Sequence, residues 1–207
     1  MKIGLFECPP EIVKYMSGDG GRKLGLQRLK QYSERMQRDF GAMKPWLPEK
    51  ATAVLDIGCG LGGIDVMLAR HYGDDLTVYL ADGDGSGHRK MGFVGGTEAW
   101  ADVSIGETFV RSNAPRIKVE GRNCNDPHEF SGMAVDLVVS MKSWGHHYPV
   151  SAYAETVKGA IALSRHARVI MDIRRGTDGA TEMGRRGFKL VGKVAETVKC
   201  ERLAFSL

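Results

Sequence analysis

The sequence lacks long apolar runs and closely spaced cysteines, and each absence narrows the class of protein. No stretch approaches the roughly 20 apolar residues that a membrane-spanning helix needs. The first residues hold one lysine and few apolar side chains before Pro9 and Pro10, so they do not resemble a secretory signal. The four cysteines form no CxxC pair, which argues against a zinc module or a disulfide framework. We therefore expect a cytoplasmic protein.

The sequence also lacks a large excess of charge of one sign. The 29 basic and 25 acidic residues leave a net charge of +4, which permits anionic partners without requiring any. The 207 residues suit one domain, and 43% apolar with 26% charged residues is a globular balance. Basic residues gather in 22–38 and 174–193, but acids or predicted helices accompany them, so we interpret both stretches as solvated faces.

Residues 1–48 form a predicted N-terminal extension. Residues 1–20 are expected to be irregular, because Pro9 and Pro10 oppose regular structure and 17–21 is rich in turn residues. From 22 to 43 apolar residues recur at helical spacing, and prolines then end the helix. The extension is interpreted as a lid or as packing. Tyr32 and Met36 are expected in the core.

Residues 49–207 alternate between predicted strands and helices. Strands are expected at 53–57, 76–81, 116–120, 134–140 and 167–173, followed by extended segments at 188–194 and 197–206. Helices are expected at 62–71, 98–113, 150–164 and 177–186, with a loop over 83–96. This alternation predicts a doubly wound, Rossmann-like α/β fold with helices on both faces of a seven-stranded, mostly parallel sheet. The last strand is expected to be antiparallel.

The strongest functional signal is the string DIGCGLGG at residues 56–63, between a predicted strand and a predicted helix. Glycines there permit a tight turn and let a ligand approach the backbone at a helix N-terminus. A turn without a ligand is the alternative interpretation. Gly58, Gly60 and Gly63 also fit the GxGxxG dinucleotide pattern, and Asp82 lies where a ribose-binding acid would follow. Asp56 decides between these ligands, because a carboxylate repels a pyrophosphate and attracts an ammonium group.

The string VLDIGCGLGG resembles motif I of the class I S-adenosylmethionine-dependent methyltransferases. The order of elements over 52–207 is similar to that of this family too. The resemblance implies a methyltransferase domain at 49–207 with S-adenosylmethionine as its cofactor. By the same resemblance, the methionine part of the cofactor would be surrounded by Asp56, Gly58, Cys59, Gly60 and Gly62.

The resemblance also implies contacts for the rest of the cofactor. Asp82 would accept hydrogen bonds from both ribose hydroxyls, with Gly83 beside it. Asp126 would lie near the adenine amino group, although a simple turn explains its loop equally well. Ser140, at the end of the fourth strand, completes the expected cofactor-binding set.

The methyl acceptor is expected at the loop after the fourth strand, which reads SMKSWGHHYP at residues 140–149. His146 or His147 is the candidate base that removes a hydroxyl proton. Lys142, Trp144 and Tyr148 are the candidate acceptor contacts. Aromatic capping of the sheet, with exposed histidines, is the alternative. The SWGHHYP stretch also resembles a loop of some sugar O-methyltransferases.

Missing motifs restrict the acceptor further. The loop lacks the Asn/Asp-Pro-Pro-aromatic signature of amino methylation, a Pro-Cys nucleophile, and the strand-end acid that holds magnesium in catechol-type enzymes. We therefore expect metal-independent O-methylation of a small or sugar-like hydroxyl acceptor. The alternatives are methylation of RNA or DNA, a nicotinamide-dependent reductase, and a cofactor-binding protein without catalysis. No membrane partner is expected, and a homodimer is allowed.

Overall fold

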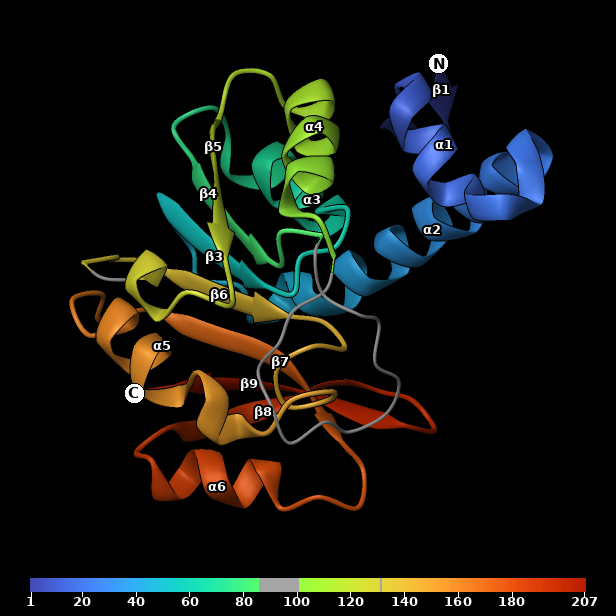
Figure 1. Cartoon of the computed structure of the whole chain (residues 1–207). Helices are drawn as coiled ribbons and strands as arrows, with labels where there is room; N and C mark the ends of the chain where they lie inside the picture. Colours follow the sequence, from blue (N-terminus) through green and yellow to red (C-terminus); the bar gives the residue numbers. More distant parts are fainter. Residues whose placement is uncertain (86–100, 131) are drawn as a thin grey trace.

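The computed structural model describes residues 1–85, 101–130 and 132–207, and its centre is a seven-stranded sheet (Figure 1). The order across the sheet is β5-β4-β3-β6-β7-β9-β8. The strands span Ala53–Ile57 (β3), Thr77–Asp82 (β4), Lys118–Asn123 (β5), Leu137–Ser140 (β6), Arg168–Arg174 (β7), Lys189–Glu196 (β8) and Cys200–Ser206 (β9). β3 to β7 pair in parallel, and β9 enters antiparallel to both β7 and β8. The predicted sheet, including its antiparallel last strand, is confirmed.

Helices cover both faces of the sheet (Figure 1). On one face lie α2 (Gly21–Met43), α3 (Gly63–Tyr72) and α4 (Val103–Asn113), and on the other lie α5 (Ala154–Ile161) and α6 (Gly179–Arg185). Successive residues of a strand point to opposite faces, so Val54 joins the core under α3 while Leu55 joins the core under α5. Asp56 follows in this alternation and points towards the α3 side.

Several boundaries differ from the predicted ones. β5 begins at Lys118 and continues to Asn123, because residues 115–116 form a turn instead of starting the strand. The predicted helix over 150–164 is a 3-10 turn, η4 (Val150–Ala152), followed by the shorter α5. Asp102 caps α4 by accepting a hydrogen bond from the Ser104 amide at 2.9 Å. Residues 86–100, which include most of the predicted loop over 83–96, lie outside the described residues.

The prediction that residues 1–20 are irregular is wrong. A hairpin of β1 (Lys2–Ile3) and β2 (Phe6–Glu7) precedes α1 (Pro10–Ser17). Pro10 occupies the first turn of α1, where its missing amide hydrogen is not needed and its fixed φ suits a helix. Phe6 is fully buried and meets the Phe109 ring of α4 edge-on, with ring centroids 5.1 Å apart. The arm is therefore packed against the domain.

Helix α2 connects this arm to the sheet. The helix is 23 residues long, but among the described residues no helix is apolar enough over sufficient length to cross a membrane. Near its end, Asp39 accepts a hydrogen bond from Arg202 of β9 at 3.1 Å. The same guanidinium binds both carboxylate oxygens of Asp172 on β7, at 2.8 and 3.1 Å. Because Arg202 and Asp172 are only 5% and 1% exposed, this bidentate pair is almost completely desolvated.

We expect Arg202→Ala to lower the free energy of unfolding by about 3–5 kcal/mol, because it leaves the Asp172 carboxylate buried without its partner. Urea unfolding followed by circular dichroism measures the loss. The control is Arg175→Ala, whose ion pairs with Glu196 and Glu201 are exposed, and it should cost less than about 1 kcal/mol. Equal losses for the two variants would contradict a structural role for the Arg202 pair.

Candidate functional site

The candidate site lies where the carboxyl ends of β3 and β6 meet. β3 and β6 are neighbours in the sheet, but the chain leaves β3 towards β4 and leaves β6 towards β7, in opposite directions across the sheet. The loops after β3 and β6 therefore diverge at this point, which is where ligands bind in such folds. The loop after β3 contains Gly58, Gly60 and Gly62, which all have left-handed backbones with φ of +77°, +55° and +70°. A side chain at Gly58 would overlap Ser143, since its Cβ would lie 2.1 Å from the Ser143 Cβ. Only glycine lets the two loops pack this closely.

A cavity of about 170 Å³ opens beside the glycine loop. The predicted residues that line it are Asp56, Gly58, Cys59, Gly60 and Lys142. Lys142 itself has a left-handed backbone, with φ of +61°, and its amide donates to Asp172 at 3.2 Å. The structure therefore brings the loops after β3 and β6 to one cavity, as the sequence interpretation requires.

One wall of the cavity comes from α2, which the sequence interpretation assigned to a lid or to packing. Tyr32, Arg35, Met36 and Asp39 line it, at the i, i+3, i+4 and i+7 positions that share one helix face. Met36 is buried, as expected of a core residue, but it also contacts the cavity. The charged pair Arg35 and Asp39 within this otherwise apolar stripe was the available signal for a functional face.

Tyr32 fixes the start of α3. Its hydroxyl accepts a hydrogen bond from the Gly63 amide at 2.8 Å, and a Cβ at Gly63 would lie only 2.5 Å from that oxygen. The Arg35 guanidinium lies over the Tyr32 ring, 5.2 Å from its centroid, in a cation–π contact. α2 thus covers the N-terminus of α3 directly.

The amides of the glycine loop are largely engaged within the protein. Gly58 and Cys59 donate to the Ala81 carbonyl at 2.7 and 3.2 Å, and Gly62 donates to the Cys59 carbonyl at 2.9 Å. Gly60 donates to Asp82, and Gly63 donates to Tyr32. A pyrophosphate binds a helix N-terminus through free amides. This arrangement therefore disfavours the dinucleotide interpretation, which glycine spacing alone had left open.

Buried acids dominate the electrostatics of the site. Asp56 is 3% exposed, and its Oδ1 has no hydrogen-bond partner among the described residues. Burial, together with the nearby acids Asp65 and Asp82, raises the pKa of Asp56 well above its ordinary value. A cation placed in this cavity would reverse that effect, because it would compensate the buried negative charge.

Asp82 is held by the backbone at the end of β4. Its two carboxylate oxygens accept hydrogen bonds from the amides of Gly60, at 3.0 Å, and Gly83, at 2.9 Å. Burial still raises its pKa, against the lowering effect of these bonds. Asp126 is exposed and accepts a hydrogen bond from the His128 amide at 2.9 Å, at the start of the turn η3 (Pro127–Phe130). Contacts of Asp82 and Gly83 with ribose, and of Asp126 with adenine, stay predictions.

Ser140, the last residue of β6, and Trp144, in the loop after it, have structural roles, of which the sequence interpretation gave only that of Trp144, as the alternative of aromatic capping. The Ser140 hydroxyl is fully buried, donates to the Ile57 carbonyl at 2.8 Å and accepts from the Trp144 amide at 2.9 Å. Trp144 is also fully buried, and its indole donates to the Val150 carbonyl at 2.8 Å. Ser140 therefore ties β6 to β3, and Trp144 packs in the core under α5 instead of forming a pocket wall.

The two histidines of this loop differ in their surroundings. His146 is 5% exposed, and its Nδ1 has no hydrogen-bond partner among the described residues. Burial, His147 and Arg174 lower the pKa of His146, so its imidazole is neutral at pH 7. His147 is half-buried, and its ring centroid lies 5.0 Å from that of His146. Tyr148 is mostly buried in the same loop.

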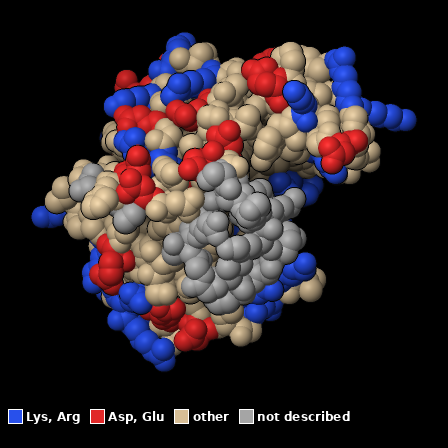
Figure 2. Space-filling model, in the orientation of Figure 1, with Lys and Arg blue, Asp and Glu red and all other residues tan. Residues whose placement is uncertain are grey.

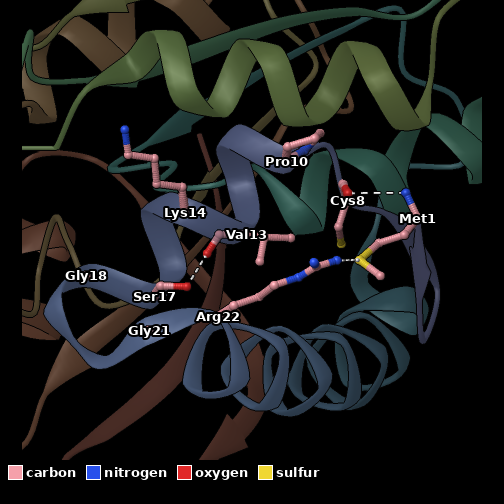
Figure 3. A pocket seen from close by; sticks show the side chains of 9 residues that line it. All are labelled: Met1, Cys8, Pro10, Val13, Lys14, Ser17, Gly18, Gly21 and Arg22. Atoms are coloured by element: carbon pink, nitrogen blue, oxygen red, sulfur yellow. Dashed lines mark hydrogen bonds between the residues drawn. The ribbon is translucent and has the colours of Figure 1, made fainter.

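A second cavity, of about 550 Å³, lies between α1 and the start of α2, away from the glycine loop (Figure 3). Two of its polar groups are engaged within the chain: the Ser17 hydroxyl donates to the Val13 carbonyl, and the N-terminal amine donates to the Cys8 carbonyl. Unlike the site at Asp56, this cavity has no unpartnered buried polar atom among its described lining residues. It therefore lacks the features of a specific site.

Comparison with solved structures places this geometry in a known fold. A methyltransferase from Aquifex aeolicus that depends on S-adenosylmethionine superimposes with a TM-score of 0.58 at 12% identity, over 81% of this chain and 88% of that one. Magnesium protoporphyrin IX methyltransferase from Synechocystis, with S-adenosylmethionine bound, gives 0.54 at 14% identity, over 94% and 89%. The chain has the class I methyltransferase fold.

The ribosomal protein L11 methylase of Lactobacillus delbrueckii shares this fold, with a TM-score of 0.56 at 12% identity, over 84% of this chain and 79% of that one. No family model and no curated protein matches the sequence. The methyltransferase fold is therefore established by structure, and the identities are too low to carry an activity or an acceptor with it.

Gly106 of α4 is a further residue that positions the glycine loop in this methyltransferase fold. A Cβ at Gly106 would lie 2.7 Å from the Gly60 carbonyl oxygen, which is backbone and cannot rotate away. We expect Gly106→Ala to lower the free energy of unfolding by about 1–3 kcal/mol through overpacking, and to weaken binding at the loop. Thermal unfolding and calorimetric titration measure the two effects.

The matched control is Gly159→Ala in α5, where a Cβ meets nothing within 4 Å. Alanine should raise stability there by about 0.5–1 kcal/mol, because it restricts the unfolded chain in a helix-compatible position. If Gly106→Ala raised the stability, α4 would not be in close contact with the glycine loop at Gly60.

Proposed function

We propose that this protein is an S-adenosylmethionine-dependent methyltransferase. The observation that carries the proposal is the Asp56 carboxylate: it is buried, it lacks a partner at Oδ1, and it lines a cavity beside the left-handed glycine loop. S-adenosylmethionine has an ammonium group and a sulfonium centre, so it offers the positive charge that this cavity requires.

The other residues of the cavity fit the same molecule. Arg35, held over the Tyr32 ring, is the basic side chain suited to the carboxylate of the methionine part. The left-handed loop at Gly60 leaves open space where a Cβ would be. Asp82 has lone pairs beyond those used by its backbone amide donors, and these suit the ribose hydroxyls. Asp126 stays the candidate for the adenine amino group.

For the reaction we propose methyl transfer to a hydroxyl of a small or sugar-like acceptor, without a metal. When bound, S-adenosylmethionine supplies an electrophilic methyl group, and transfer is an in-line displacement that depends on alignment. His146 would accept the proton of the acceptor hydroxyl, since burial keeps its imidazole neutral. Lys142, at the cavity wall, and Tyr148 are the candidate acceptor contacts.

The competing functions have less support. The L11 methylase and the protoporphyrin methyltransferase are named for very different acceptors, so the shared fold does not choose one. Methylation of RNA or DNA would need basic side chains at the phosphates, and the candidates in the sequence are Arg174, Arg175, Arg185 and Arg186. Three of these four, Arg175, Arg185 and Arg186, each form an ion pair with an acid. Figure 2 shows acidic side chains among the basic ones along this part of the surface. A nicotinamide-dependent reductase would need loop amides that are already engaged.

We expect Asp56→Asn to weaken S-adenosylmethionine binding about 10- to 100-fold, because it replaces a charge-assisted hydrogen bond with a neutral one. Isothermal titration calorimetry measures the affinity. Asp74→Asn is the control, since Asp74 forms an exposed ion pair with Arg116, and it should leave the affinity unchanged. Binding of NADH by the unmodified protein, with no binding of S-adenosylmethionine, would reject the proposed function.

We expect His146→Gln to lower turnover about 100-fold or more, while the affinity for S-adenosylmethionine stays within twofold. His147→Gln is the matched control and should cost less than tenfold. Because burial lowers the pKa of His146, the acid limb of the wild-type rate profile should fall below pH 6.5. The acceptor for this assay is first identified by screening sugars, phenols, nucleosides and RNA with a labelled methyl donor. Unchanged turnover in His146→Gln would rule out this base.

A further inference from the structure

A second acid, Asp65, lies behind Asp56 at the candidate site. Asp65 is in the first turn of α3 and is 0% exposed, and neither of its carboxylate oxygens accepts a hydrogen bond from an amide, hydroxyl or basic group of another described residue. Gly62 keeps it close to the loop, because a Cβ at Gly62 would lie 3.3 Å from the Asp65 Oδ2. An acid in the first turn of a helix is ordinary when it caps an amide or faces water. Asp65 does neither.

The side chains of Asp56 and Asp65 lie within hydrogen-bonding reach of each other. Two ionised carboxylates only accept hydrogen bonds, so a bond between them requires a proton on one of the two. Two like charges this close in a buried place cannot both be stable, which favours a single shared proton. The pair then carries one negative charge in total.

The surrounding side chains do not compensate the negative charge of Asp56 and Asp65. Asp82 faces it from β4, and its negative charge opposes ionisation of Asp56. From α2, Tyr32 approaches the pair; its hydroxyl accepts from Gly63, and burial raises its pKa so that it stays neutral. Arg35 lies on the Tyr32 ring, and Arg202 is engaged by Asp172 and Asp39. Cys59, in the loop, stays a neutral thiol because burial raises its pKa.

We propose that Asp56 and Asp65 act as one acidic pair that binds the ammonium group of the ligand in exchange for the proton that the two carboxyls share in the ligand-free protein. This inference rests on the proposed function. The proton passes to solvent, and the ammonium keeps its own three protons. Asp56, which lines the cavity, receives the ligand, and Asp65 is a positioning residue that acts through Asp56.

The proposal predicts how binding depends on pH. Burial raises the pKa of Asp65 to about 7 and raises the pKa of Asp56 well above its ordinary value, so the pair holds a proton in the neutral range. When a ligand displaces a proton, its association constant rises with pH, by up to tenfold per unit for one proton released. Affinity should therefore increase from pH 5.5 to pH 7.5.

The test is calorimetric titration of the full chain at pH 6.5 with S-adenosylhomocysteine, in buffers of different ionisation enthalpy. The slope of the observed enthalpy against the buffer enthalpy gives the number of protons released. We expect a release of between about 0.5 and 1 proton for the wild-type protein, and less than a third of that for Asp65→Asn. Methylthioadenosine, which has the adenosine part but no ammonium group, is the control ligand and should release none.

The outcomes separate the two proposals. Binding of S-adenosylhomocysteine without proton release would overturn the acidic pair and leave the proposed function standing. Proton release that persists in Asp65→Asn, or that occurs with methylthioadenosine, would also overturn it. No binding of either adenosine compound by the wild-type protein would reject the proposed function itself.

A stability measurement shows that the variant is folded and tests the pair without ligand. A carboxyl whose pKa is raised on folding binds more protons in the folded state, so wild-type stability should fall as pH rises through the raised value. The unfolding temperature should fall between pH 5 and pH 8 in the wild type and vary less in Asp65→Asn. If the two profiles had the same slope, Asp65 would hold no proton in the ligand-free protein.

Discussion

The Asp56 carboxylate occupies a place where the fold would otherwise have an apolar side chain. Strand alternation points Val54 and Asp56 of β3 to the same face, under α3, and Val54 is fully buried there. The carboxylate therefore loses its water without gaining a partner at Oδ1. The surrounding features follow from this constraint: a glycine loop that leaves space, a second acid nearby, and a cavity that a cation would fit.

Helix α2 changes how the extension should be understood. It is joined to the sheet through the buried contact between Arg202, Asp172 and Asp39, and it caps α3 through the hydroxyl of Tyr32. These two attachments fix the helix at both sides of the cavity. The cavity wall formed by α2 is therefore fixed by the fold, and the same helix face carries buried apolar residues together with Arg35 and Asp39.

The glycine loop after β3 and the loop after β6 are packed against each other. Gly58 accommodates Ser143, and the Ser140 hydroxyl bonds to the last carbonyl of β3. The loop that carries His146 is therefore positioned directly against the glycine loop that follows Asp56 and β3. Trp144 anchors it from the opposite face of the sheet through its buried indole. The loops at the cavity are consequently held in place by packing in both cores.

Much of this protein was determined by sequence alone. The β3 strand was predicted residue for residue. The doubly wound sheet followed from the alternation of strands and helices, and its antiparallel last strand from the two extended segments at the end of the chain, because these are local patterns. Contacts between residues far apart in the sequence could be seen only in the tertiary structure. Asp65 meets Asp56, and Tyr32 meets Gly63, only because α2, β3 and α3 pack together. Likewise, the sequence predicts cofactor binding by Ser140 and acceptor contact by Trp144, and in the folded chain the polar groups of both side chains are engaged in buried hydrogen bonds. Distance and desolvation arise from packing, and they decide which polar residues remain free to act.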